Sequence, residues 1–113
     1  MLANQIKLEI AKEVLTKSGW GKDIECVHSL SEAIKNDRFI FDIDNNEIIS
    51  FVAWEDLQEI NGQKRVFIKS LWIDPRYRNR NYVIKIRTIL RNRFKDTKGV
   101  WLNIKKDKLI ERI

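Results

Sequence analysis

The residues best suited to chemistry lie between positions 71 and 83, where the apolar stretch Leu71-Trp72-Ile73 runs into a loop rich in arginine. The rest of this segment includes Arg76, Arg78, Asn79, Arg80, Asn81, Tyr82 and Val83. We expect a helix to begin here, and the first N–H groups of a helix have no intrahelical partners and carry the positive end of its dipole. Arginines beside such a helix start favour binding of an anion such as a phosphate, and the alternative is a solvated basic loop.

Carboxylates near the ends of the expected strands are candidates for a general base. Glu55, Asp56 and Glu59 follow the second expected strand, and Asp74 precedes the basic loop. A general base takes a proton from the nucleophile and works best when burial brings its pKa toward neutrality. Glu55 is our candidate for the catalytic base, and the alternative for each of the four is a solvated acid in a turn.

The scarcity of cysteine and histidine excludes several kinds of site. Cys26 and His28 are the only residues of their types, so they cannot form an internal disulfide or a Cys/His zinc site. We therefore predict no bound metal. No run approaches the ~20 apolar residues of a membrane-spanning helix, and the first residues do not resemble a secretory signal. We expect no membrane partner and a cytoplasmic location.

Charge divides the chain into two unlike halves. Residues 1–63 contain 6 basic and 12 acidic side chains, whereas residues 64–113 contain 16 basic and 4 acidic ones. The stretch Arg76–Lys95 holds eight Lys and Arg and no acid, with Tyr77 and Tyr82 among them. Cationic surfaces attract anions, and exposed aromatic rings stack on bases. Nucleic acid, a phosphorylated cofactor and an acidic protein partner therefore all fit this half of the chain.

Hydrophobic periodicity predicts the helices that position these groups. Apolar residues recur at helical spacing over residues 3–17, and the glycines around Trp20 end that helix. Ser29-Leu30-Ser31-Glu32 has the spacing of a capping box, which predicts that a second helix begins near Ser29. A third helix is expected over Tyr82–Lys95, with an apolar face toward the sheet.

The strands follow from runs of β-branched and aromatic residues bounded by turn residues. The expected strands are 39–43, 48–54, 66–73, 100–104 and 109–113. Asn61-Gly62 predicts a tight hairpin turn, because both residues tolerate positive φ. The first three strands form an antiparallel meander, and the helix that follows crosses over to a parallel strand. We predict a single α+β domain over residues 1–113, with a mixed, mostly antiparallel sheet.

This order of elements resembles the GNAT (GCN5-related N-acetyltransferase) superfamily. In that family the third meander strand ends in an apolar residue, a variable residue and proline, and an [Arg/Gln]-x-x-Gly-x-[Gly/Ala] loop follows. Ile73-Asp74-Pro75 matches the approach to the loop, and Arg78 matches its first position. Asn81 stands at the first glycine and Val83 at the second small residue. The resemblance covers most of the chain as topology and about ten residues as a motif.

The resemblance implies an N-acyltransferase that moves an acetyl or other acyl group from acyl-CoA to a primary amine. Acyl-CoA would lie between residues 71–73 and 100–102, with its phosphates on residues 78–83. The implied cofactor-binding residues are Leu71, Trp72, Ile73, Arg76, Arg78, Asn79, Arg80, Asn81, Tyr82 and Val83. The resemblance also implies a shortened member, because the chain ends about where the last helix and strands would stand. No tyrosine follows Tyr82 to serve as the family's general acid.

A second hypothesis is a GNAT-like binding module that has lost catalysis and uses its basic half to bind nucleic acid or an acidic protein. We expect Asn81 to keep a left-handed backbone in place of glycine, whereas the branched side chain of Val83 would crowd a pyrophosphate. An unpaired edge strand would favour a homodimer. The small size and the Ile/Lys/Asn-rich composition would suit a phage protein. Binding of acyl-CoA separates the two hypotheses.

Overall fold

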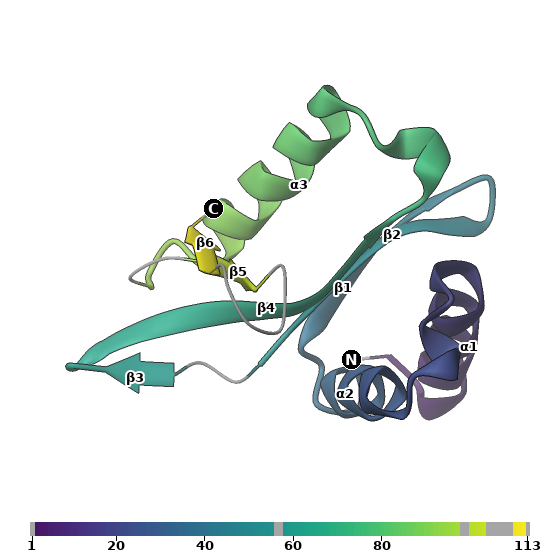
Figure 1. Cartoon of the computed structure of the whole chain (residues 1–113), viewed down its shortest axis with the longest axis horizontal. Coiled ribbons are helices and arrows are strands. Elements are labelled where there is room, and N and C mark those ends of the chain that lie inside the picture. Colours follow the sequence, from purple (N-terminus) through teal and green to yellow (C-terminus); the bar gives the residue numbers. More distant parts are fainter. Residues whose placement is uncertain (1, 56–57, 98–99, 104–109, 113) are drawn as a thin grey trace.

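A mixed β-sheet with helices on both faces forms the structure (Figure 1). The computed structural model describes residues 2–55, 58–97, 100–103 and 110–112. The helices are α1 (Asn4–Ser18), α2 (Ile24–Lys35) and α3 (Arg80–Arg93), with the short 3-10 helices η1 (Trp20–Lys22) and η2 (Pro75–Tyr77). The strands are β1 (Phe39–Asp44), β2 (Glu47–Trp54), β3 (Gln58–Ile60), β4 (Gln63–Ile73), β5 (Val100–Asn103) and β6 (Ile110–Arg112). α1 and α2 cover one face of the sheet and α3 covers the other.

The order of the strands confirms the predicted α+β fold with a mixed sheet. The order is β1-β2-β4-β5-β6. β1, β2 and β4 form an antiparallel meander, β5 joins β4 in parallel, and β6 returns antiparallel to β5. α3 is the crossover between β4 and β5, as the strand–helix–strand pattern predicts. The two N-terminal helices are also confirmed.

The hairpin turn at Asn61-Gly62 is confirmed, but the strands around it are more extensive than predicted. Asn61 (φ 54°) and Gly62 (φ 75°) both have the positive φ that a tight two-residue turn requires. The turn joins β3 to β4, which begins at Gln63 rather than at Val66. β3 has three residues, and a segment of this length has no hydrophobic pattern from which a strand can be predicted. It pairs only with the first residues of β4, so the rest of β4 pairs with β2 and β5.

α2 begins earlier than the capping-box pattern predicts. Its N-cap is Asp23, whose carboxylate accepts hydrogen bonds from the N–H groups of Glu25 (2.9 Å) and Cys26 (3.4 Å). A carboxylate at this place satisfies free N–H groups and also interacts favourably with the helix dipole. Ser29 therefore lies within the helix, and the predicted start near Ser29 is wrong. His28 is exposed on the second turn of α2.

The other two helices differ from their predicted ranges by one or two residues. α1 is shifted by one residue and ends at Gly19, which has a left-handed backbone (φ 79°). α3 begins at Arg80 and ends at Arg93, two residues before each predicted boundary. The earlier start follows from Asn79, whose side chain accepts the N–H of Tyr82 at 2.9 Å and so caps the helix.

Two hydrophobic clusters lie on opposite faces of the sheet and meet in β2. Phe51 packs beneath α1 and α2, whereas its neighbour Val52 and Trp54 pack beneath α3. Trp54 and Trp72 are each 6% exposed and belong to this core. β2 and the end of β4 are therefore held from both sides, and they provide a rigid base for the site described below.

Some of the expectations fall outside the described residues. These are Asp56, the ends of the predicted last strands at 104, 109 and 113, and the side chains of strand β5. Of the helices described, none combines the length and the apolar character needed to cross a bilayer. Across the same residues, no three His, Cys, Asp or Glu side chains gather as they would around a metal ion.

Candidate functional site

β4 is irregular where the site begins. Ala53 of β2 pairs with Ser70, but the next residue, Trp54, pairs with Ile68, so β4 has one extra residue at this point. A bulge of this kind bends the strand and increases its twist. The pairing of β5 with β4 ends at Ile68, immediately before the bulge. The last part of β4, residues 71–73, therefore extends past the end of the β5 pairing.

The backbone at the end of β4 presents polar groups on the side away from β2. The Asp74 N–H donates to the Ile49 carbonyl at 2.7 Å, and Ser50 lies opposite Ile73. Antiparallel neighbours alternate between hydrogen-bonded and non-hydrogen-bonded pairs, so the N–H and C=O groups of Ile73 and Leu71 point toward the β5 side. The N–H groups of these two residues can therefore donate to a ligand that lies beside β4.

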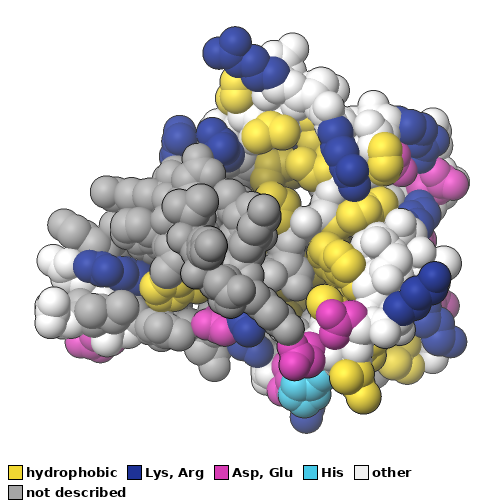
Figure 2. All heavy atoms as spheres, viewed as in Figure 1, with side chains coloured by type: hydrophobic (Ala, Val, Ile, Leu, Met, Phe, Trp, Pro, Cys, Tyr) yellow, Lys and Arg dark blue, Asp and Glu magenta, His cyan; other side chains and the backbone are white. Residues whose placement is uncertain are grey.

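A cleft of about 620 Å³ lies at this end of the strand, and we call it the β4 cleft. The end of β4, the loop after η2, the start of α3 and the end of α1 with η1 form its walls. The lining residues are Ser18, Trp20, Leu71, Trp72, Ile73, Arg78, Asn79, Arg80 and Val83. On the face shown in Figure 2, hydrophobic side chains gather in the centre and Lys and Arg side chains stand around them.

The β4 cleft brings together seven of the ten residues predicted to bind a cofactor. These seven are Leu71, Trp72, Ile73, Arg78, Asn79, Arg80 and Val83. The Arg78 Nε donates to the Ile73 carbonyl at 2.7 Å, which fixes the arginine against the end of β4. The start of α3 carries basic side chains and no acidic residue in its first turn. An anion in the cleft would therefore meet both the helix dipole and arginine side chains.

The other three predicted residues, Arg76, Asn81 and Tyr82, do not line this cleft. The guanidinium of Arg76 is bound by Asp74 and by Glu47, which is 29 residues away in the sequence. Asn81 is exposed on α3, and the Tyr82 side chain turns toward β1. These three are structural or surface residues in this conformation.

Arg76 and Asp74 form a hydrogen-bonded pair at the entrance to the loop. The Arg76 N–H and Nε donate to Asp74 Oδ1 at 2.9 and 3.1 Å, and its Nη2 donates to Oδ2 at 2.9 Å. The guanidinium, followed by the backbone N–H, lowers the pKa of Asp74 from 3.8 to about 2, and the same contacts raise the pKa of Arg76. Both oxygens of Asp74 therefore accept hydrogen bonds from Arg76, and its low pKa makes it a weak proton acceptor, which removes it as a candidate base.

The hydrogen-bonded pair of Asp74 and Arg76 predicts that the protein loses stability at low pH. Because the folded-state pKa lies below the unfolded value, the unfolded chain binds the proton first, and the contribution of Asp74 is lost as pH falls from about 4 to 2. In Asp74→Asn, we expect the free energy of unfolding to depend less on pH across this window than in the wild type. Urea unfolding at a series of pH values measures the difference. Equal slopes for the two proteins would contradict the assignment.

Both tyrosines of the chain attach this loop region to β1. The Tyr82 hydroxyl lies 2.8 Å from Ser50 Oγ and donates to Asp42 Oδ2 at 2.8 Å, while the Tyr77 hydroxyl donates to Asp44. Burial, together with Asp42, raises the pKa of Tyr82 to about 12, and the bond to Asp44 raises that of Tyr77. Both phenols therefore stay protonated and hold the two ends of the loop.

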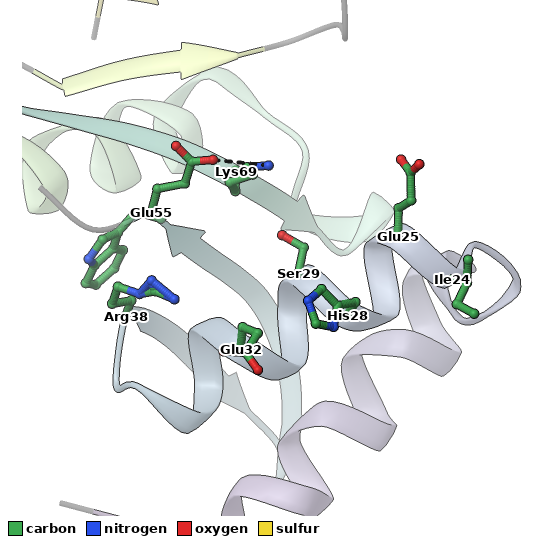
Figure 3. A pocket seen from close by; sticks show the side chains of 9 residues that line it. Ile24, Glu25, His28, Ser29, Glu32, Arg38, Glu55 and Lys69 are labelled. Carbon is green, nitrogen blue, oxygen red and sulfur yellow. Dashed lines mark ion pairs between the residues drawn. The ribbon is translucent and has the colours of Figure 1, made fainter. Parts of the chain in front are cut away.

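Glu55 lies in a different cavity, on the α2 side of the sheet. This α2 cavity, of about 700 Å³, is shown in Figure 3. It is lined by Ile24, Glu25, His28, Ser29, Glu32, Arg38, Trp54, Glu55 and Lys69. Glu55 forms an ion pair with Lys69 at 3.1 Å. Lys69, which lines the α2 cavity, and Leu71, which lines the β4 cleft, are two residues apart in β4.

Most residues of the α2 cavity are not predicted to be functional, because the predicted start of α2 near Ser29 is too late. With the helix starting at Ile24, the spacing of Glu25, His28 and Glu32 places them on one side of the helix, and this face lines the cavity. Of the other base candidates, Glu59 is exposed on β3 and does not line either space. A correct start for α2 would have revealed the grouping.

Comparison with known proteins identifies the fold. No protein-family model matches the sequence, and no curated protein resembles it significantly. Solved structures do: an aminoglycoside acetyltransferase from an uncultured soil metagenomic sample has a TM-score of 0.64 at 15% identity, over 93% of this chain and 75% of that one. The ribosomal-protein-alanine N-acetyltransferase of Brucella melitensis has a TM-score of 0.63 at 11% identity, over 88% and 77%. The fold is that of the GNAT acetyltransferases.

A third solved structure of this fold was determined with a ligand. It is a predicted acetyltransferase with acetyl-CoA from Clostridium acetobutylicum, with a TM-score of 0.57 at 18% identity over 90% of this chain and 75% of that one. Within the GNAT fold of our chain, the motif positions Arg78 and Val83 both line the β4 cleft. Asn81 is the second residue of α3 and has no positive φ, so the left-handed backbone expected there is wrong. Because α3 begins at Arg80, Asn81 has the backbone of a right-handed helix instead.

Proposed function

We propose that this protein is an N-acyltransferase that binds acyl-CoA in the β4 cleft and transfers the acyl group to a primary amine in the α2 cavity. The observation that carries the proposal is the β4 cleft beside the end of β4. Among the described residues the pairing with β5 ends at Ile68, before residues 71–73, and the cleft beside these residues contains apolar walls, backbone donors and arginines. The acetyl-CoA complex and the sisomicin complex among the similar structures support the same assignment.

The lining of the β4 cleft fits the chemical parts of acyl-CoA. Leu71, Ile73 and Val83 provide apolar walls for a pantetheine arm, and Arg78 with the start of α3 provides the positive potential that a pyrophosphate needs. Acyl-CoA would supply a thioester carbonyl, which is the group that an amine attacks. The N–H groups of Leu71 and Ile73 would stabilise negative charge on the carbonyl oxygen.

The α2 cavity is suited to an amine. Glu25, Glu32 and Glu55 line it, and carboxylates attract a protonated amine from solvent. Glu55 forms an ion pair with Lys69, which is the extra residue of the β4 bulge. Its role in the proposal is to accept the proton that the amine must lose as its nitrogen bonds to the acyl carbon, while the C–S bond breaks and CoA leaves as a thiolate that takes a proton from solvent. In this proposal acyl-CoA occupies the β4 cleft and the amine occupies the α2 cavity, and the lining residues Leu71 and Lys69 are two residues apart in β4.

The first test is calorimetric titration of the protein with acetyl-CoA and with CoA. We expect micromolar binding, weakened by about 10- to 150-fold in Arg78→Ala, because a hydrogen bond to a charged group contributes about 1.5–3 kcal/mol. Arg78→Lys keeps the charge but loses the planar fork, so its affinity should lie between the two. Lys12→Ala, on the exposed side of α1, serves as the control and should bind as the wild type does.

Binding and folding must be separated in this experiment. Circular dichroism of each variant checks that the fold is retained, since Arg78 also bonds to the Ile73 carbonyl. A folded wild type that shows neither heat nor a thermal shift at millimolar acetyl-CoA would overturn the acyltransferase proposal. The alternative of a GNAT-like binding module without catalysis would then replace it.

A further inference from the structure

One edge of α3 carries a row of cations. Arg80, Arg87 and Arg91 are separated by seven and four residues, a spacing that puts them on the same edge of a helix, and Lys95 follows in the turn after α3. At 1.5 Å per residue, the three arginines span about 16 Å. We call these four residues the α3 basic edge. Arg80, Arg91 and Lys95 are exposed and Arg87 is half-buried.

The two edges of α3 differ in how their charges are balanced. On the edge near β1, Lys85 pairs with Asp42 at 3.5 Å, and Arg93 stacks over the Trp54 ring at 5.0 Å. On the α3 basic edge, the described residues form no ion pair with Arg80, Arg91 or Lys95. In Figure 2, Lys and Arg side chains appear over the region of α3 without Asp or Glu side chains among them.

This arrangement is unfavourable for the isolated helix. Like charges four residues apart, as in Arg87 and Arg91, repel one another along a helix. Arg80 lies in the first turn, where the helix dipole disfavours a cation and where no acidic residue compensates for it. A bound polyanion would relieve both effects at once. The half of the chain that contains α3 also holds most of the excess positive charge.

We propose that the α3 basic edge binds the phosphate backbone of nucleic acid. A row of cations along one edge of a helix suits a polyanion, and duplex DNA carries about one charge per 1.7 Å of its axis. Arginine forks bind phosphate oxygens in pairs. The edge offers no pattern of polar side chains for reading bases, so binding is independent of sequence.

The salt dependence of binding gives a quantitative test. Three phosphate contacts on duplex DNA, from Arg80, Arg91 and Lys95, predict a slope of log K against log salt of about −2.7, or a loss of affinity of about 40-fold between 50 and 200 mM KCl. We would measure anisotropy of a labelled duplex of about 20 base pairs with the full chain. In Arg91→Gln/Lys95→Gln, two contacts are removed, so the slope should fall to about −0.9 and the loss to about 3.5-fold.

The control changes the same net charge at another surface. Lys12→Gln/Lys35→Gln, on α1 and α2, should keep the wild-type slope. No binding at about 50 mM KCl, or the same reduction of slope in both double variants, would overturn the proposal. Complete displacement of the duplex by saturating CoA would assign binding to the β4 cleft instead. Competition by polyglutamate as strong as that by DNA would assign the edge to an acidic protein.

Discussion

Glu55→Gln should lower kcat by about 10²–10⁴-fold and leave the affinity for acetyl-CoA unchanged. A general base contributes a factor of this size because the amine must lose a proton as it attacks. The affinity should be unaffected because Glu55 lines the α2 cavity and not the β4 cleft. The measurement is steady-state kinetics with the primary amine that an acceptor screen selects, together with calorimetric titration of acetyl-CoA.

The matched control for this substitution is Glu59→Gln. It removes the same charge from an exposed position on β3 that lines neither space, so kcat should stay at the wild-type value. If Glu55→Gln retains wild-type kcat, the proton goes to another acceptor and the role assigned to Glu55 is wrong. If kcat falls but acetyl-CoA affinity falls equally, the two cavities are not independent, which contradicts the geometry described here.

Phe51→Ala should destabilise the protein by about 3–5 kcal/mol. Phe51 is fully buried at 0% exposure and stacks on Phe39 with ring centroids 5.8 Å apart. Its removal leaves a cavity beneath α1 and α2, and losses of this size are typical when a buried aromatic ring is truncated. Urea unfolding followed by circular dichroism measures the change in the free energy of unfolding.

Phe41→Ala provides the comparison on the neighbouring strand. Phe41 is half-buried and packs at the border of the same cluster, so its truncation should cost clearly less than that of Phe51. Equal losses for the two variants would show that the cluster is not organised around β2. A loss of stability below about 1 kcal/mol for Phe51→Ala would show that neighbouring side chains move into the cavity and fill it.

The parts of the fold that the sequence predicts are those governed by local patterns. The Asn61-Gly62 turn requires positive φ at two successive residues, and few other pairs allow it. The strands and the crossover helix follow from runs of apolar residues. The start of α2 is mispredicted because two N-cap signals compete, and Asp23 satisfies the helix better than the expected capping box does.

The candidate site depends more on contacts between distant residues, and these are hidden in the sequence. Arg76 is one of three arginines in the loop, yet Glu47 and Asp74 bind it and only Arg78 and Arg80 reach the β4 cleft. No local pattern distinguishes the three. The sequence does not reveal the bulge either, because the extra residue of β4, Lys69, is neither glycine nor proline. The sequence therefore predicts most residues of the β4 cleft but not the bulge in β4.

The bulge in β4 also limits how the length of this chain can vary. Ile68 faces α3, and because of the extra residue Leu71 faces α3 as well, three positions later. Deletion of one residue between them would rotate the first half of β4 and expose Ile68 on the wrong face. Insertions and deletions among related sequences should therefore be excluded between positions 68 and 71. They should be tolerated at the β3–β4 turn, which lies beyond the meander, so the gap pattern of an alignment would reveal the bulge.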